Sequence, residues 1–148
     1  MKRVSVGADD RMPITDRLLE ELKARGFDVA GYGPMVGRDE QWAEVGERVA
    51  RDVAEGHADT GIACCYTGTG VSMAANKVPG ARAALCRDAE TARGARAWND
   101  ANVLCLSLTS TPEDELPGIL DAWFDEIPVD EEERGSINRL AALDGARG

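Results

Sequence analysis

Residues 60–77 read Thr-Gly-Ile-Ala-Cys-Cys-Tyr-Thr-Gly-Thr-Gly-Val-Ser-Met-Ala-Ala-Asn-Lys, and this stretch decides the fold. It begins with an apolar run of strand length, passes through a loop with two glycines, and ends in an alanine-rich segment, residues 71–77, that favours a helix. A glycine loop that opens onto a helix N-terminus directs several backbone N–H groups at one point, which favours an anion or a developing oxyanion. Cys65 ends the strand, at the edge where open α/β sheets bind their ligands.

This position gives the Cys65 thiol either a chemical or a structural role. The partial positive charge of a helix N-terminus favours the thiolate, which is the form needed in a base or a nucleophile. Alternatively, Gly68 and Gly70 only make a tight turn, and Cys65 packs as a small hydrophobic side chain. Two nucleotide-binding loops are excluded, because no glycine precedes Lys77 and because Met73 occupies the place of the third glycine of the dinucleotide fingerprint.

The rest of the chain alternates between strand-like and helix-like segments. Apolar runs predict strands at residues 2–8, 27–32, 60–64, 81–86 and 103–108. Helical spacing predicts helices at residues 15–25, 39–55, 71–77, 88–96, 112–125 and 131–143. Pro117 is expected to bend the fifth of these helices or to delay its start. The alternation predicts a three-layer α/β fold (αβα) with a doubly wound, five-stranded parallel sheet of Rossmann-like type.

Composition and charge restrict the class of partner. The 148 residues are enough for a single domain, 1–148, whose C-terminal helix, residues 131–143, docks on its own domain or on a partner subunit. The net charge of −10 argues against nucleic acid and against an anionic membrane as partners. No apolar run approaches the ~20 residues of a membrane span, and no signal peptide is recognisable, so we expect a cytoplasmic protein. The four cysteines and His57 have no metal-ligand spacing, so we expect reduced thiols and no metal site.

Residues 65–77 resemble the C-G-T-G-x-G-x-S-x-A-A-N-K signature of the ribose-5-phosphate isomerase B family, which includes the galactose-6-phosphate isomerase subunits. Residues 6–9, 78–86 and 99–104 extend the resemblance over nearly the whole chain. It implies aldose–ketose isomerisation of a small sugar or sugar phosphate through a cis-enediolate, without a metal or other cofactor. It also implies a homodimer with active sites at the subunit interface, while a tetramer remains open.

The resemblance assigns roles to individual residues. Cys65 would be the base that moves a proton between C1 and C2, and Asp9 or Thr67 would shuttle the hydroxyl proton. Asn99 would contact sugar hydroxyls from the other subunit. Backbone N–H groups would hold the oxygen that becomes negatively charged. They belong to the loop residues Gly68, Thr69, Gly70, Val71 and Ser72.

Four positions near the expected substrate depart from the family's pattern. Asp10 replaces a histidine after the first strand, and Trp98 replaces the histidine assigned to opening a furanose ring. Trp42 aligns with an active-site tyrosine, and Tyr66 replaces the glycine that follows the cysteine. The three aromatic side chains would suit the C–H surface of a sugar. The structural alternatives are a helix cap for Asp10 and a core position for each tryptophan.

The expected phosphate contacts are also altered. Thr109 stands where the family has an arginine after the fifth strand, and the C-terminal arginine pair appears as Arg134 and Arg139, one residue too far apart. Each lost charge-assisted contact would cost ~1.5–3 kcal/mol of binding free energy. Arg134 and Arg139 are either substrate ligands or solvated charges. Four further arginines are either surface charges or the source of a replacement contact: Arg82, Arg87, Arg93 and Arg96.

These departures favour an isomerase whose substrate is not a cyclic ribose 5-phosphate. A tetrose or tetrulose phosphate, or another acyclic sugar, fits because four-carbon 4-phosphates cannot close a furanose ring. Three alternatives stay open: the family's default ribose-5-phosphate isomerase, an epimerase that shares the enediolate, and a non-catalytic protein that binds a sugar or sugar phosphate.

Overall fold

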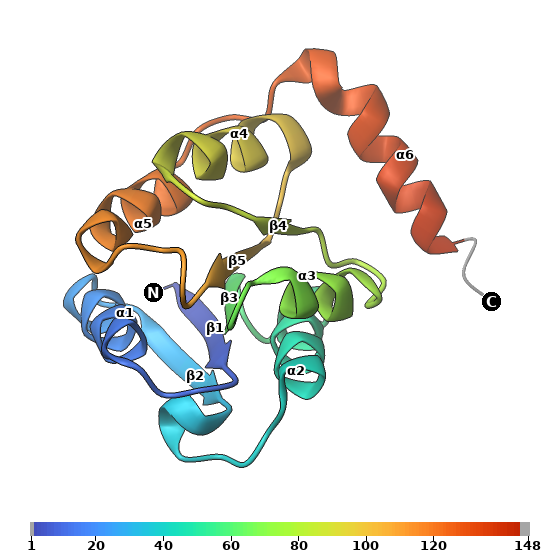
Figure 1. Ribbon diagram of the computed structural model, residues 1–148. Helices are drawn as coiled ribbons and strands as arrows, with labels where there is room; N and C mark the ends of the chain where they lie inside the picture. The colour runs from blue at the N-terminus through green and yellow to red at the C-terminus, as the bar shows by residue number, and fades with distance from the viewer. Residues whose placement is uncertain (1, 146–148) are drawn as a thin grey trace.

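The computed structural model describes residues 2–145 as an α/β/α sandwich (Figure 1). Its sheet has five parallel strands in the order β2-β1-β3-β5-β4, which confirms the predicted fold class. The strands are β1 (Arg3–Ala8), β2 (Asp28–Tyr32), β3 (Thr60–Cys65), β4 (Ala83–Leu85) and β5 (Val103–Ser107). Within residues 2–145, no helix is both long and apolar enough to cross a membrane.

Within the described residues, six α-helices and three short 3-10 turns join and follow the strands. The helices are α1 (Pro13–Ala24), α2 (Trp42–Ala54), α3 (Thr69–Asn76), α4 (Ala89–Asn99), α5 (Leu116–Phe124) and α6 (Arg134–Gly145). The turns are Pro34–Val36, Glu113–Glu115 and Glu131–Glu133. All six predicted helices are therefore present. Pro117 lies in the first turn of α5 after a 3-10 turn, so the delayed start is the correct alternative.

Four predicted helix starts are wrong by two or three residues: α3 begins two residues earlier than predicted, α6 begins three later, after a 3-10 turn, and α1 and α2 also differ. Helix α1 begins earlier than expected, at Pro13, because proline suits the first helical position and the Thr15 hydroxyl accepts a hydrogen bond from the Met12 N–H at 2.9 Å. Helix α2 begins later, because Glu40 is held outside it. The buried Glu40 carboxylate accepts a hydrogen bond from the Gly33 N–H at 2.8 Å and pairs with Arg48 at 3.0 Å.

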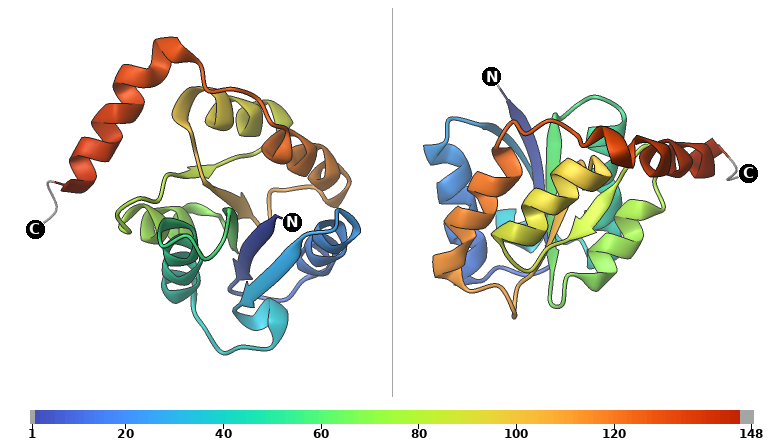
Figure 2. Two further views of the ribbon diagram at one scale, coloured as in Figure 1. Left: turned by 180° about the vertical axis from the view of Figure 1, so that it is seen from behind. Right: turned by 90° about the horizontal axis from the view of Figure 1, so that it is seen from above.

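Neighbouring residues of each central strand face opposite layers of the sandwich. Ile62 and Cys64 belong to the core under α1, α4 and α5, whereas Ala63 and Cys65 belong to the core under α2 and α3. The two adjacent cysteines therefore point into different layers. Figure 2 shows the two layers of helices on either side of the sheet.

The sheet order creates a crevice at the carboxyl ends of β1 and β3. These neighbouring strands lead to helices on opposite faces, α1 on one and α3 on the other. Such a switch point is where open α/β sheets bind ligands. It places the segment after Ala8 beside the segment after Cys65, which are the two segments predicted to carry the chemistry.

Helix α6 extends away from the α/β body, as both views in Figure 2 show. Ile137 is buried, but Leu140 and Leu143 are 44% and 47% exposed and border a cleft of about 320 Å³ against the body. The Asp144 carboxylate accepts a hydrogen bond from the Gly80 N–H at 2.8 Å, which ties the end of α6 to its own chain. The apolar side chains of α6 are thus only partly covered, and docking of α6 on a partner subunit stays a prediction.

Replacing Thr60 with valine is expected to lower the free energy of unfolding by about 1–3 kcal/mol. The buried Trp123 indole N–H donates to the Thr60 hydroxyl at 2.9 Å, and valine would leave that donor without an acceptor. Urea unfolding of the variant measures the effect. Thr60→Ser keeps the hydroxyl and serves as the control, so an equal loss in both variants would contradict this explanation.

Candidate active site

Cys65 lies at the carboxyl end of β3, where hydrogen bonds to β5 fix its backbone. It is 4% exposed and pairs in register with Ser107. Its carbonyl accepts a hydrogen bond from the Leu108 N–H at 3.0 Å. The next carbonyl, that of Tyr66, accepts from the Thr109 and Ser107 hydroxyls at 2.9 and 3.0 Å. The Thr109 hydroxyl is therefore engaged with the backbone, and the Tyr66 side chain, 68% exposed, points away from the core.

The glycine loop leads directly into helix α3. Gly68 has a φ of +79°, and a Cβ there would lie 2.5 Å from a Leu85 methyl carbon, so only glycine fits. The Thr67 and Thr69 hydroxyls are hydrogen-bonded at 2.7 Å. Of the predicted oxyanion donors, Ser72 is already engaged, because its N–H donates to the Gly68 carbonyl at 3.3 Å. The N–H groups of the three residues before Ser72, at the N-terminus of α3, remain candidate donors to the oxyanion. They belong to Thr69, Gly70 and Val71.

Trp42 forms a wall beside this loop. A Cβ added at Gly70 would lie 2.7–3.2 Å from atoms of the Trp42 indole, so the ring lies directly against the loop backbone. Trp42 begins α2 and is 45% exposed, which makes the core alternative wrong for this residue. The structure therefore brings Trp42 to the loop that carries the expected oxyanion donors, as a substrate-contacting role requires.

Asp9 and Asp10 follow β1 on the other side of the crevice. The Asp9 N–H donates to the Cys64 carbonyl at 3.3 Å, which brings the Asp9 backbone to the end of β3. Burial raises the pKa of the Asp9 carboxyl, and the neighbouring charge of Asp10 raises it further, against an opposing backbone hydrogen bond. Asp10 does not cap α1, contrary to the structural alternative, because its carboxylate accepts from the Arg11 N–H at 2.8 Å.

Replacing Asp10 with asparagine is expected to shift the acid limb of the pH–kcat/KM profile to lower pH. The substitution removes a negative charge that raises the Asp9 pKa, so Asp9 would stay ionised, and able to accept a proton, to a lower pH. Carbon NMR of the Asp9 carboxyl should show the same shift. Asp16→Asn removes an exposed carboxylate from α1 and is the matched control. An unchanged Asp9 titration in Asp10→Asn would contradict the expected coupling.

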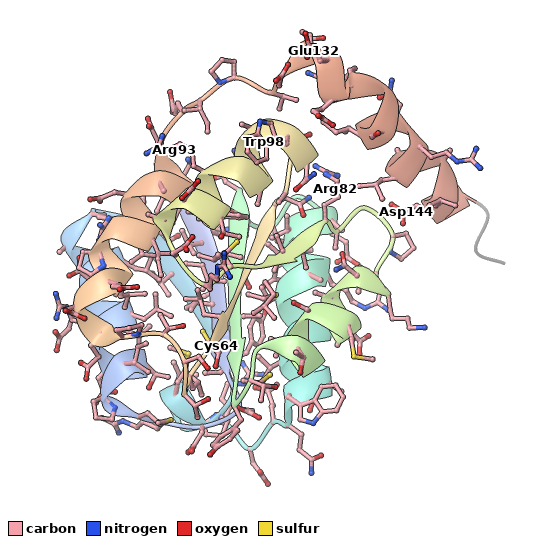
Figure 3. All side chains as sticks on the ribbon, turned by 45° about the horizontal axis from the view of Figure 1, so that its top comes forward. Cys64, Arg82, Arg93, Trp98, Glu132 and Asp144 are labelled. Atoms are coloured by element: carbon pink, nitrogen blue, oxygen red, sulfur yellow. The ribbon has the colours of Figure 1, made fainter. Side chains whose placement is uncertain are left out.

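Four predicted site residues do not reach Cys65 within one chain. Trp98 and Asn99 end α4, and Arg134 and Arg139 lie on α6. Figure 3 shows Trp98 at the end of α4, well apart from Cys64 in the sheet. Trp98 lies over Gly94 of its own helix and is 55% exposed, so the core alternative is wrong here too.

Of the two C-terminal arginines, Arg134 has a local partner. It pairs with Glu131 at 3.1 Å, whereas Arg139 lies on an exposed part of α6. In one chain, Arg134 thus behaves as the solvated charge that the structural alternative describes.

A pocket that sequence reasoning did not find adjoins Thr67. It has a volume of about 490 Å³ and lies between the ends of β4 and β5 and the N-terminus of α4. Its lining is rich in hydroxyl groups and comprises Thr67, Leu85, Cys86, Arg87, Thr91, Ser107, Ser110 and Thr111. The run Ser-Leu-Thr-Ser-Thr at residues 107–111, directly after a strand, is the feature of the sequence that could have indicated it.

The other three cysteines, Cys64, Cys86 and Cys105, are buried core thiols. Burial raises the pKa of Cys86 to about 12 and that of Cys105 to about 12, and it also raises the pKa of Cys64. These thiols therefore stay protonated at neutral pH. Among residues 2–145, no group of three or more His, Cys, Asp or Glu side chains lies close enough together to hold a metal ion.

Comparison with known proteins gives one consistent result. Residues 4–142 match the family model of the Ribose/Galactose Isomerase family. Galactose-6-phosphate isomerase subunit LacB of Clostridium acetobutylicum is 37% identical over 82% of this chain and 71% of its own. Ribose-5-phosphate isomerase B of Escherichia coli is 33% identical, and D-erythrulose-4-phosphate isomerase of Pectobacterium atrosepticum is 31% identical, each over 84% of both chains. The structure of ribose-5-phosphate isomerase B from Clostridium thermocellum has a TM-score of 0.89 and 32% identity over 99% of both chains.

Proposed function

Since the chain belongs to the Ribose/Galactose Isomerase family and is a sugar-phosphate isomerase, we propose that it interconverts an aldose and a ketose with Cys65 as the base. One observation carries this assignment. Cys65 ends β3 at the switch point of the sheet, with the segment that carries Asp9 on one side and the N-terminus of α3 following it.

The residues around Cys65 can perform each step of the reaction. The Cys65 thiolate takes the proton from the carbon next to the carbonyl, and the C–H electron pair forms the enediolate double bond. The N–H groups at the start of α3 stabilise the negative charge on oxygen. Asp9 or Thr67 moves the hydroxyl proton between the two oxygens. Return of the carbon-bound proton to the neighbouring carbon completes the isomerisation, so the overall reaction is redox-neutral and needs no metal or other cofactor.

A short, acyclic substrate is the second part of the proposal. Trp98 stands where the family has its ring-opening histidine. Thr109 replaces a phosphate-binding arginine, and its hydroxyl donates to the Tyr66 carbonyl. A four-carbon 4-phosphate needs no ring opening, so the loss of that histidine does not affect it. The similarity to a protein named D-erythrulose-4-phosphate isomerase, over 84% of both chains, supports a substrate of this length.

We also propose that the active unit is a homodimer. Trp98, Asn99, Arg134 and Arg139 lie away from Cys65 in one chain, so a second copy must supply any of them that contact substrate. Apolar side chains at the cleft beside α6 remain about half exposed, which favours a protein partner. Analytical ultracentrifugation should give the mass of two chains. A tetramer built from such dimers would preserve the site, whereas a monomer at catalytic concentration would contradict the proposal.

Proton NMR in heavy water tests the chemistry directly. The panel contains D-erythrulose 4-phosphate, D-erythrose 4-phosphate, D-ribose 5-phosphate and the unphosphorylated sugars, with and without EDTA. We expect deuterium next to the carbonyl of the four-carbon phosphates, at a rate that EDTA does not change. The product distinguishes an aldose–ketose isomerase from an epimerase. Absence of exchange with every sugar would overturn the proposal in favour of a binding protein without turnover.

A further inference from the structure

Given the proposed function, we infer that Arg87 and the hydroxyl-lined pocket beside Thr67 bind the phosphate end of the substrate. The protein carries a net charge of −10, so a phosphate ester needs a local cation. Among residues 2–145, Arg87 is the one cationic residue that lines this pocket. The pocket adjoins the proposed catalytic loop through Thr67.

The lining has the chemistry that phosphate requires. Five hydroxyl-bearing residues surround the space, and all but Ser107, whose hydroxyl already donates to the Tyr66 carbonyl, can donate to a phosphate oxygen. They are Thr67, Thr91, Ser107, Ser110 and Thr111. The N-terminus of α4, which has eleven residues, borders the same space through Thr91, and its dipole favours a negative charge there. A guanidinium group adds two parallel donors that match two phosphate oxygens.

Arg87 differs from the other three arginines considered as replacements, because its side chain is largely exposed and its ion pair is with the adjacent residue. Arg82 and Arg96 each donate to a backbone carbonyl, and Arg93 pairs with a carboxylate at 3.0 Å. The Arg87 side chain is 88% exposed, and its only ion pair among the described residues is a 3.4 Å contact to Asp88. The Asp88 carboxylate also caps α4, because its other oxygen accepts from the Thr91 N–H at 2.8 Å.

The pocket lies at a suitable distance from the proposed base. Ser107 lines it and pairs in register with Cys65 on the neighbouring strand. Neighbouring strands lie about 5 Å apart. A phosphate in the pocket and reacting carbons at Cys65 would therefore be separated by little more than one strand spacing. This separation suits a short carbon chain and agrees with the four-carbon substrate proposed above.

Arg87→Gln tests the inference, with Arg93→Gln as a control that removes the same charge from an exposed position on α4 outside the pocket lining. Binding of inorganic phosphate and of D-erythrulose 4-phosphate is measured by calorimetry. We expect Kd to rise about ten- to a hundredfold in Arg87→Gln, to recover partly in Arg87→Lys and to stay unchanged in Arg93→Gln. The deuterium exchange of unphosphorylated D-erythrulose should not change in any of these variants.

The outcomes separate this inference from the proposed function. Unchanged phosphate binding in Arg87→Gln, or an equal loss for phosphorylated and unphosphorylated sugar, would overturn the role of Arg87 while isomerase activity could persist. Arg87-dependent phosphate binding in a protein that exchanges no sugar proton would instead preserve the anion site and overturn the isomerase proposal.

Discussion

Replacing Cys65 with alanine is expected to reduce deuterium exchange and kcat about a thousandfold, with the fold intact. A positioned base contributes a factor of about 10²–10⁴ to a proton transfer, and within this crevice the thiol is the group that ends β3 directly before the oxyanion loop. The measurement is the rate of deuterium uptake into the substrate, together with the far-UV circular dichroism of the variant. Cys65→Ser should recover little activity, because a hydroxyl is a much weaker acid than a thiol.

Cys64→Ala is the matched control, because it removes an adjacent thiol that points into the opposite layer. Burial raises the pKa of the Cys64 thiol, so this group does not serve as a base at neutral pH. We expect its loss to lower the free energy of unfolding while kcat stays within about threefold of the unmodified value, since Cys64 takes no part in proton transfer. Full activity in Cys65→Ala would refute the role of Cys65. An equal loss of activity in Cys65→Ala and Cys64→Ala would indicate a packing effect.

The sequence predicts the fold well because local patterns determine it. Apolar runs and helical spacing identify every strand and helix of the sheet sandwich, and the segment 60–77 places Cys65, the loop and α3 in the correct order. The start of α2 is predicted wrongly because Glu40 bonds to Gly33, a contact that follows from tertiary packing rather than from spacing. Periodicity cannot reveal a buried carboxylate of this kind.

The site is predicted only in part, because its residues come from several segments. The crevice beside Cys65 follows from topology, but the pocket lined by Ser107 and Arg87 requires β4 and β5 to be placed side by side. Exposure is likewise invisible in the sequence. Tryptophan is a typical core residue, but Trp42 and Trp98 both lie at the surface. Trp123 is the tryptophan that fills the core.

Turnover of D-erythrulose 4-phosphate is expected to exceed that of D-ribose 5-phosphate by at least about a hundredfold in kcat/KM. Ring opening of a furanose needs an acid or base at the ring oxygen or its hydroxyl, a contribution of about 10²–10⁴, and Trp98 cannot provide it. Trp98→His should therefore raise kcat/KM for ribose 5-phosphate and leave the four-carbon substrate nearly unchanged. Trp98→Phe removes the indole without adding a proton donor and should give no increase. Comparable turnover of both sugars by the unmodified protein would refute the proposed substrate class.

The same substitution shows which chain supplies position 98. In one chain, Trp98 lies on an exposed surface at the end of α4, so a histidine there can act at Cys65 only across a subunit interface. Chains carrying both Cys65→Ala and Trp98→His have no base of their own. Mixed with unmodified chains, they should raise ribose 5-phosphate turnover above that of the unmodified protein alone, because each mixed dimer has one site with an intact Cys65 and the substituted position. No increase on mixing, with increased turnover by Trp98→His alone, would mean that position 98 acts within its own chain.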